Sequence, residues 1–143
     1  MLCRRHPGAV VHWGISMSKT SHDLVVEAKA AIREVSLDEA RRLIQNGATV
    51  LDVREPGEFA AGHLPGAMNI PRGLLEFKLA GTPELNDPRR PILVYCKTSG
   101  RAALATVVLQ TMGVANAVSL AGGFDAWAAE DLPIDQPAPI DFE

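Results

Sequence analysis

The chain has 143 residues, which is enough for one domain of ordinary size but not for two separate cores. Hydrophobic residues make up 47% and aromatic residues 5%, so the composition predicts an aliphatic core and an α/β protein. A net charge of -3 without a Lys- and Arg-rich run argues against nucleic acid as a partner, and no apolar run is long enough for a membrane span. Two cysteines, Cys3 and Cys96, are too few for a disulfide framework, which favours a cytoplasmic location.

The amino-terminal part of the chain has no signal-peptide core and no periodic apolar face. We therefore expect residues 1–20 to form a disordered extension, whose first 16 residues can be deleted with little effect on melting temperature or turnover. Residues 21–31 predict an accessory amphipathic helix, capped by Ser21 or Asp23. The buried face of this helix is expected to hold Leu24, Ala28 and Ala31 or Ile32.

The central part of the chain alternates between β-branched apolar runs, typical of buried strands, and helical patterns. Strands are expected at residues 33–35, 49–53, 67–68, 92–95 and 117–120. Helices are expected from Ser36 through Ile44 and at residues 56–61, 74–79, 101–112 and 123–129, with a surface loop at 81–90. The expected apolar stripe of helix 101–112 is Leu104, Val107, Val108 and Met112. Strands that alternate with helices predict a parallel sheet of about five strands, covered by helices on both faces.

The loop from Cys96 to Arg101 joins the clearest buried strand to the clearest helix. In an open α/β sheet such a loop lies at the carboxyl edge of the strands, where ligands bind. The positive end of the helix dipole and the cations Lys97 and Arg101 favour a thiolate at Cys96, and Gly100 allows a positive φ and a close backbone approach to sulfur. An inert cysteine at a strand end, beside ordinary solvated charges, is the alternative interpretation.

Three segments, in order, resemble the rhodanese homology domain. LDVREPGEFAAGHLPGAMNIP (51–71) is similar to its amino-terminal signature, and YCKTSGR (95–101) to its active loop of a cysteine, four residues and an arginine. AGGFDAWAAEDLP (121–133) is similar to its carboxy-terminal signature. The resemblance implies a three-layer rhodanese-like domain over residues 32–135, followed by a tail at 136–143.

The resemblance also implies a sulfurtransferase. Cys96 would take a sulfane sulfur from a small anionic donor such as thiosulfate, carry it as a persulfide, and pass it to cyanide or to a thiol, protein thiols included. Backbone N–H groups, two cations and two hydroxyls of the loop would hold the donor. The residues expected to do so are Lys97, Thr98, Ser99, Gly100 and Arg101.

Residues outside the loop have expected roles as well. Asp52 and Arg54 end the neighbouring strand at the same edge, so they either support the loop or form a structural salt bridge. His63 is expected to make a structural hydrogen bond rather than act as a base, and Trp127 to pack in the core. No clustered Cys and His pattern indicates a metal, and no cofactor is expected.

Two residues depart from the family's usual loop pattern, and two other functions are alternatives to sulfur transfer. Ser99 stands where many family members have glycine, and Ala102 where serine is frequent, which leaves the donor preference and the rate open. A cysteine phosphatase or arsenate reductase of similar fold is one rival, but those phosphatases have five residues between Cys and Arg, and here there are four. A non-catalytic sulfur-carrier or regulatory module is the other.

Overall fold

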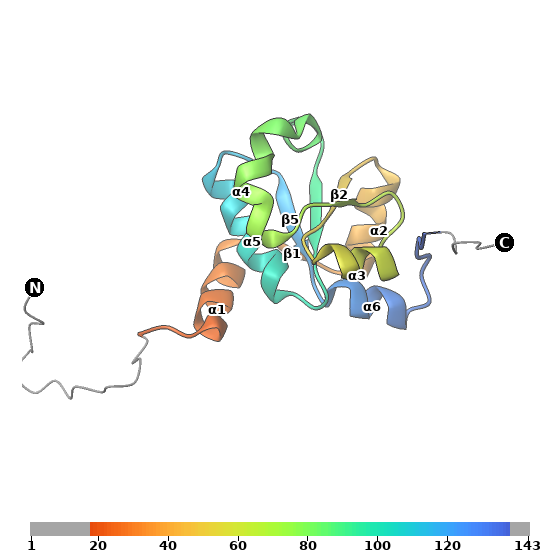
Figure 1. Cartoon of the computed structure of the whole chain (residues 1–143), viewed down its shortest axis with the longest axis horizontal. Helices are drawn as coiled ribbons and strands as arrows, with labels where there is room; N and C mark the ends of the chain where they lie inside the picture. Colours follow the sequence, from red (N-terminus) through yellow and green to blue (C-terminus); the bar gives the residue numbers. More distant parts are fainter. Residues whose placement is uncertain (1–17, 138–143) are drawn as a thin grey trace, which may run out of the picture.

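The computed structural model describes residues 18–137 as one α/β domain (Figure 1). The expectations for residues 1–16, a range that includes Cys3, lie outside the described residues. The strands are β1 (Glu34–Val35), β2 (Thr49–Asp52), β3 (Met68–Asn69), β4 (Ile92–Tyr95) and β5 (Ala117–Leu120). They form a parallel sheet, as the alternating sequence pattern predicted, and their order in it is β1-β5-β4-β2-β3.

The helices match the predicted elements closely. They are α1 (Ser21–Ala31), α2 (Leu37–Gln45), α3 (Pro56–Ala61), α4 (Leu75–Lys78), α5 (Gly100–Thr111) and α6 (Gly123–Ala129). Three 3-10 turns follow β3: η1 (Arg72–Leu74), η2 (Leu79–Gly81) and η3 (Pro83–Leu85). Among residues 18–137, no helix is long and apolar enough to cross a membrane.

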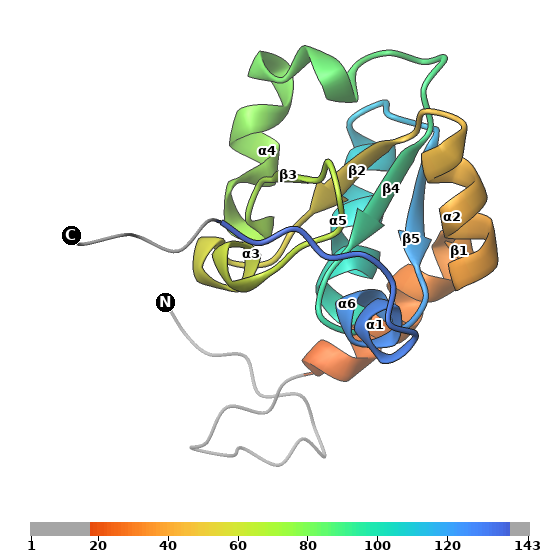
Figure 2. The same ribbon diagram turned by 90° about the vertical axis from the view of Figure 1, so that its right-hand side faces the viewer.

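The sheet separates two apolar clusters because successive side chains of a strand point to opposite faces. In the central strand β4, Ile92 and Val94 pack in the cluster under α4 and α5, whereas Leu93 and Tyr95 pack in the cluster under α2 and α6. These helices lie on opposite sides of the sheet in Figure 2. α1 packs on α5, outside the sheet itself.

Local signals explain where several helices begin and end. Ser36 caps α2, since its Oγ accepts the backbone N–H of Glu39 at 3.2 Å, and the chain turns after this helix at Gly47 with φ +90°. Pro56 opens α3, where a missing N–H costs no hydrogen bond.

The predicted cap of α1 is wrong, and its predicted apolar face is right at Ala28 but wrong at Leu24. Thr20, and not Ser21 or Asp23, is the N-cap residue, with its side chain accepting the backbone N–H of Asp23. Leu24 is 46% exposed, while Ala28 is buried. The helix packs through small side chains, which let it approach α5 closely.

The apolar stripe predicted for α5 is also wrong. Met112 is 46% exposed, and the fully buried positions of the helix are Ala102, Ala103, Ala105, Thr106 and Leu109. Because α5 lies between the sheet and α1, small residues occupy its most crowded faces. The expected surface loop at 81–90 is partly ordered as η3, which buries Leu85.

Candidate active site

Cys96 directly follows β4, the central strand, at the carboxyl edge of the sheet. Its side chain is 1% exposed and packs with the apolar cluster beneath α5. From β2 the chain continues to β3 on one side of the sheet, and from β4 it continues to β5 on the other. Ligand sites of open α/β sheets form at such a point, where the direction of winding reverses.

The amino end of α6 holds the loop that follows Cys96. The N–H groups of Phe124 and Asp125 donate to the carbonyls of Cys96 at 2.8 Å and Lys97 at 3.0 Å. The approach depends on Gly123, which has φ +57°; a Cβ there would lie 2.4 Å from the Thr98 carbonyl oxygen and 2.5 Å from that of Cys96. Only glycine fits at this position, because both the dihedral and the space exclude a side chain.

The loop leaves a set of backbone donors unused. The N–H groups of residues 97–101 donate no hydrogen bond to any other residue in the range 18–137. In a trans peptide the N–H points away from the C=O, so carbonyls turned toward α6 turn N–H groups toward the inside of the loop. These donors, at the start of the 12-residue α5, can bind an anion.

Gly100 has a different role from the one predicted. It is the first residue of α5 and does not have a positive φ, so the expected reason for glycine there is wrong. A Cβ at Gly100 would meet Val25 of α1 at 3.4 Å, an ordinary contact. Gly122 and Gly123 are the positive-φ glycines beside the loop, and they belong to the carboxy-terminal signature seen in the sequence.

Both cations of the loop are paired with carboxylates. Arg101 binds Glu58 of α3 through two hydrogen bonds, Nη1 to Oε1 at 2.7 Å and Nη2 to Oε2 at 3.1 Å. The hydrogen bond from Arg101 lowers the pKa of Glu58 to about 2, and the same bond raises the pKa of Arg101. Lys97 Nζ lies 2.7 Å from Asp125 of α6. The expected free cations are therefore charges within neutral pairs.

Thr98 and Ser99 are the two remaining residues of the loop. Thr98 is exposed and Ser99 is half-buried, and neither side chain hydrogen-bonds to another described residue. Glu58 and Asp125 also belong to the site, although neither was predicted there. Their signals were present, because Glu58 lies in the first signature and Asp125 follows the glycine pair of the third.

A buried polar network lies behind the loop. Asp52 and Arg54 are 0% and 3% exposed and form an ion pair of 2.7 Å between Oδ2 and Nη2. The Tyr95 hydroxyl donates to Asp52 Oδ2 at 2.8 Å and accepts the N–H of Leu64 at 3.1 Å. Burial, together with the Asp52 charge, holds the pKa of Tyr95 far above its usual value. The network links the end of β2 to the residue before Cys96.

His63 and Trp127 are structural, as predicted. His63 Nδ1 lies 2.9 Å from the Phe59 carbonyl, and its ring stacks on Phe59 with 3.7 Å between centroids. Trp127 is 4% exposed and donates to the Pro133 carbonyl at 2.8 Å. Over the described range 18–137, no group of three or more His, Cys, Asp and Glu side chains is arranged to hold a metal ion.

Known proteins share both the sequence pattern and the fold. The model of the rhodanese-like domain family matches residues 36–130. Thiosulfate sulfurtransferase GlpE of Haemophilus influenzae is 32% identical over 106 residues, which cover 73% of this chain and 96% of the relative.

Solved structures of other proteins share the fold of this chain. The polysulfide-sulfur transferase homodimer of Wolinella succinogenes has a TM-score of 0.66 and 36% identity, covering 80% of this chain and 86% of that one. A Rhodopseudomonas palustris protein of unknown function, described as a possible tyrosine phosphatase, has a TM-score of 0.71 and 27% identity, covering 87% and 100%.

Proposed function

The chain belongs to the rhodanese-like domain family, and we propose that it moves sulfane sulfur from thiosulfate or a related donor to a thiophilic acceptor through a persulfide on Cys96. The observation that carries the proposal is the position of Cys96, at the base of a loop whose N–H groups are unused by the described residues. The relatives named as sulfurtransferases support this class of reaction.

The proposed reaction has two steps. In the first, the Cys96 thiolate attacks the outer sulfur of thiosulfate, the S–S bond of the donor breaks, and sulfite leaves with the bonding pair. In the second, cyanide or a thiolate attacks the outer sulfur of the persulfide, and Cys96 leaves as a thiolate. Charge and sulfur balance in each step, so neither an oxidant nor a reductant is required.

The loop stabilises the negative charge in both steps. The N–H groups of residues 97 and 98 are fixed before the donor arrives, because α6 already holds the carbonyls of Cys96 and Lys97 in the same peptide units. Preorganised donors aimed at developing charge contribute the largest electrostatic effect in many enzymes. Asp52 and Arg54 lie behind the loop and support it indirectly. Their ion pair fixes Tyr95, and Tyr95 in turn fixes the end of β4.

A phosphatase is the second candidate, and the possible tyrosine phosphatase among the structural neighbours is the observation in its favour. Four residues separate Cys96 from Arg101, and a loop of this length suits one added sulfur better than a tetrahedral phosphate. In addition, Arg101 is held by Glu58, whereas a phosphate-binding arginine needs both of its terminal nitrogens for the ligand.

The test is to load the protein with thiosulfate in the absence of an acceptor. The mass should rise by that of one sulfur atom, peptide mapping should locate the sulfur on Cys96, and cyanide should remove it. Cys96→Ser should show no added sulfur, since a serine hydroxyl stays protonated near neutral pH and attacks sulfur poorly.

Cys3 is the internal control for this experiment. Sulfur found on Cys3, or transfer at the parent rate by Cys96→Ser, would refute the carrier role of Cys96. An aryl phosphate is assayed in parallel, and efficient hydrolysis that depends on Cys96 would favour the phosphatase. A persulfide that forms but reaches no acceptor would favour the carrier module.

A further inference from the structure

A hollow of about 260 Å³ lies beside the loop, between α3 and α6. It touches both ends of the loop, because Lys97 lines it directly and Glu58, which holds Arg101, lines it from α3. The complete lining is Arg54, Glu58, Ala61, Gly62, Lys97, Phe124 and Asp125. Pockets for drug-sized ligands span roughly 300–1,000 Å³, so this one suits a smaller molecule.

Arg54 presents an unused donor to this hollow. Its side chain is 4% exposed, and its Nε and Nη2 are occupied by Asp52 and by the Gly62 carbonyl. Nη1 has no hydrogen-bond partner in the described part of the chain, yet it is not among the fully enclosed polar atoms that lack one. Arg54 lines the hollow, and because its other two nitrogens are occupied, Nη1 is the donor that remains for a ligand there. The Phe124 ring lies 4.4 Å below the guanidinium and fixes its plane.

The charges around the hollow are balanced. Lys97 is paired with Asp125, Arg54 with Asp52, and Glu58 with Arg101, so each charged group on the wall has its opposite charge in contact. A multiply charged anion such as thiosulfate gains little binding free energy from charges that are already paired. A molecule that carries one carboxylate and one ammonium matches it better. Its carboxylate would accept from Arg54 Nη1, and its ammonium would donate to Asp125, whose Oδ1 has no partner in the range 18–137.

We propose that this hollow binds the acceptor, and that the acceptor is a small thiol carrying both a carboxylate and an ammonium group, that is, an α-amino-acid thiol. The proposal rests on the sulfur transfer proposed above. The acceptor thiolate attacks the outer sulfur of the Cys96 persulfide, the S–S bond breaks, Cys96 leaves as a thiolate, and the acceptor departs as its persulfide.

Enantiomers of cysteine provide the probe, since their thiols have identical pKa and nucleophilicity. The protein is loaded with thiosulfate, freed of donor, and mixed with L-cysteine or D-cysteine while loss of the added sulfur is followed by mass. The two rates should differ by about tenfold, as expected when only one enantiomer forms an additional charge-assisted hydrogen bond. With the methyl esters of both enantiomers the ratio should fall toward one, because the carboxylate that Arg54 binds is gone.

Ala61→Leu tests the place of binding. Ala61 is exposed at the end of α3 and lines the hollow, so leucine fills the hollow while keeping a good helix former in the helix. The ratio of enantiomer rates should approach one in this variant. Ala60→Leu is the matched control, since Ala60 is an exposed residue of the same helix outside the lining, and it should keep the parent ratio.

The outcomes separate this proposal from the sulfur transfer itself. Equal rates for L- and D-cysteine in the parent protein, or a ratio that survives both esterification and Ala61→Leu, would overturn the acceptor site. If in either case cyanide still discharges the persulfide, sulfur transfer stands. Failure to form any persulfide would instead remove the function on which the acceptor site rests.

Discussion

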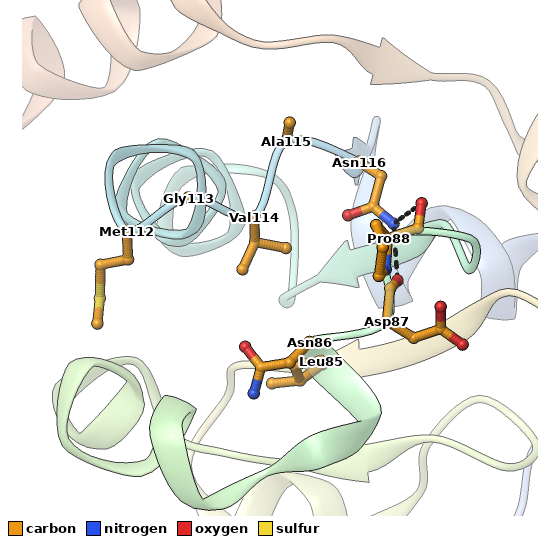
Figure 3. Close-up of a pocket in the computed structure, with 9 residues that line it drawn as sticks. All are labelled: Leu85, Asn86, Asp87, Pro88, Met112, Gly113, Val114, Ala115 and Asn116. Carbon is orange, nitrogen blue, oxygen red and sulfur yellow. Dashed lines mark hydrogen bonds between the residues drawn. The ribbon is translucent and has the colours of Figure 1, made fainter.

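The two edges of the sheet each carry a hollow, and the two hollows differ in the polar side chains beside them. At the amino edge, a hollow of about 190 Å³ lies between η3 and the turn that follows α5 (Figure 3). Its best donor, Asn116 Nδ2, already binds the carbonyls of Asp87 and Arg90. At the carboxyl edge, Arg54 Nη1 and the N–H groups after Cys96 have no partner in the described part of the chain. The two hollows therefore differ in their side chains more than in their volumes: a cysteine and a charged donor lie at the carboxyl edge, and an amide that already binds carbonyls lies at the amino edge.

The difference follows from the direction of the strands. All strands of a parallel sheet end at the same edge, and the helices that follow them begin there with unpaired N–H groups. The amino edge receives the carboxyl ends of those helices, where carbonyls are in excess. In this protein the side-chain amide of Asn116, which follows α5, donates to the Asp87 and Arg90 carbonyls in the loop before β4.

The largest expected effect, a loss of both stability and sulfur loading, comes from substituting one glycine at each edge of the sheet. Gly123→Ala at the carboxyl edge places a Cβ within 2.4 to 2.8 Å of three carbonyl oxygens, whereas Gly113→Ala at the amino edge meets no atom within 4 Å. Both glycines have a positive φ, so both variants lose stability for that reason, by roughly 1–2 kcal/mol. Gly123→Ala should lose about 3 kcal/mol or more in total and should no longer load sulfur.

Urea unfolding measures the stability of the two variants, and the thiosulfate loading assay measures how much sulfur each accepts. Gly113→Ala should load sulfur at the parent rate, because it alters only the opposite edge. Equal losses of stability in the two variants would mean that α6 does not hold the loop as the hydrogen bonds to the Cys96 and Lys97 carbonyls indicate.

The two cations of the loop should differ in their response to salt. Arg101→Ala leaves the half-buried Glu58 without a partner and frees the end of the loop, so kcat/KM for thiosulfate should fall by about tenfold or more at any ionic strength. Lys97 is 60% exposed, and Lys97→Ala should cost only about two- to threefold, an effect that shrinks between low salt and 0.5 M salt as charges are screened. A salt-sensitive loss in Arg101→Ala would mean that the cation acts by long-range attraction.

The smallest expected effect is a change in the free energy of unfolding at low pH, and it depends on Glu58. Its pKa is lowered from the usual 4.5 to about 2, so the ionised carboxylate stabilises the fold above pH 4.5, and this contribution is lost as the pH falls toward 2. The difference in unfolding free energy between the parent and Glu58→Gln should be constant above about pH 5 and should shrink below it. Chemical denaturation at several pH values measures this difference, and a gap that persists unchanged at pH 2 would contradict the pairing.

The sequence predicted the elements better than it predicted their faces. Strands such as Ile92–Tyr95 were evident because every residue in them is apolar and the neighbouring turns are marked. The buried face of α5 was missed because almost the whole helix is apolar, so no polar residues mark an outer side. Only the position of α1 against α5 decides which side is crowded.

The site shows the same limit. The spacing from Cys96 to Arg101 was enough to locate the loop, because the residues that shape it are contiguous. The partners of the cations were not evident. Glu58 falls within the amino-terminal signature, but it lies 43 positions away from Arg101, and nothing in the sequence pairs it with that residue among the 17 acidic residues of the chain. Pairing over that distance depends on how α3 and α6 are placed around the loop.

The contact between Gly123 and the loop carbonyls also affects how much conformational entropy the protein loses when a donor binds. Ordering the backbone of one residue costs about 1–2 kcal/mol, and here that cost is met during folding, since α6 fixes the carbonyls of residues 96 and 97 in the protein without any substrate. A donor that enters the loop therefore finds a rigid receptor. Its binding can be driven by enthalpy, with little loss of conformational freedom in the protein.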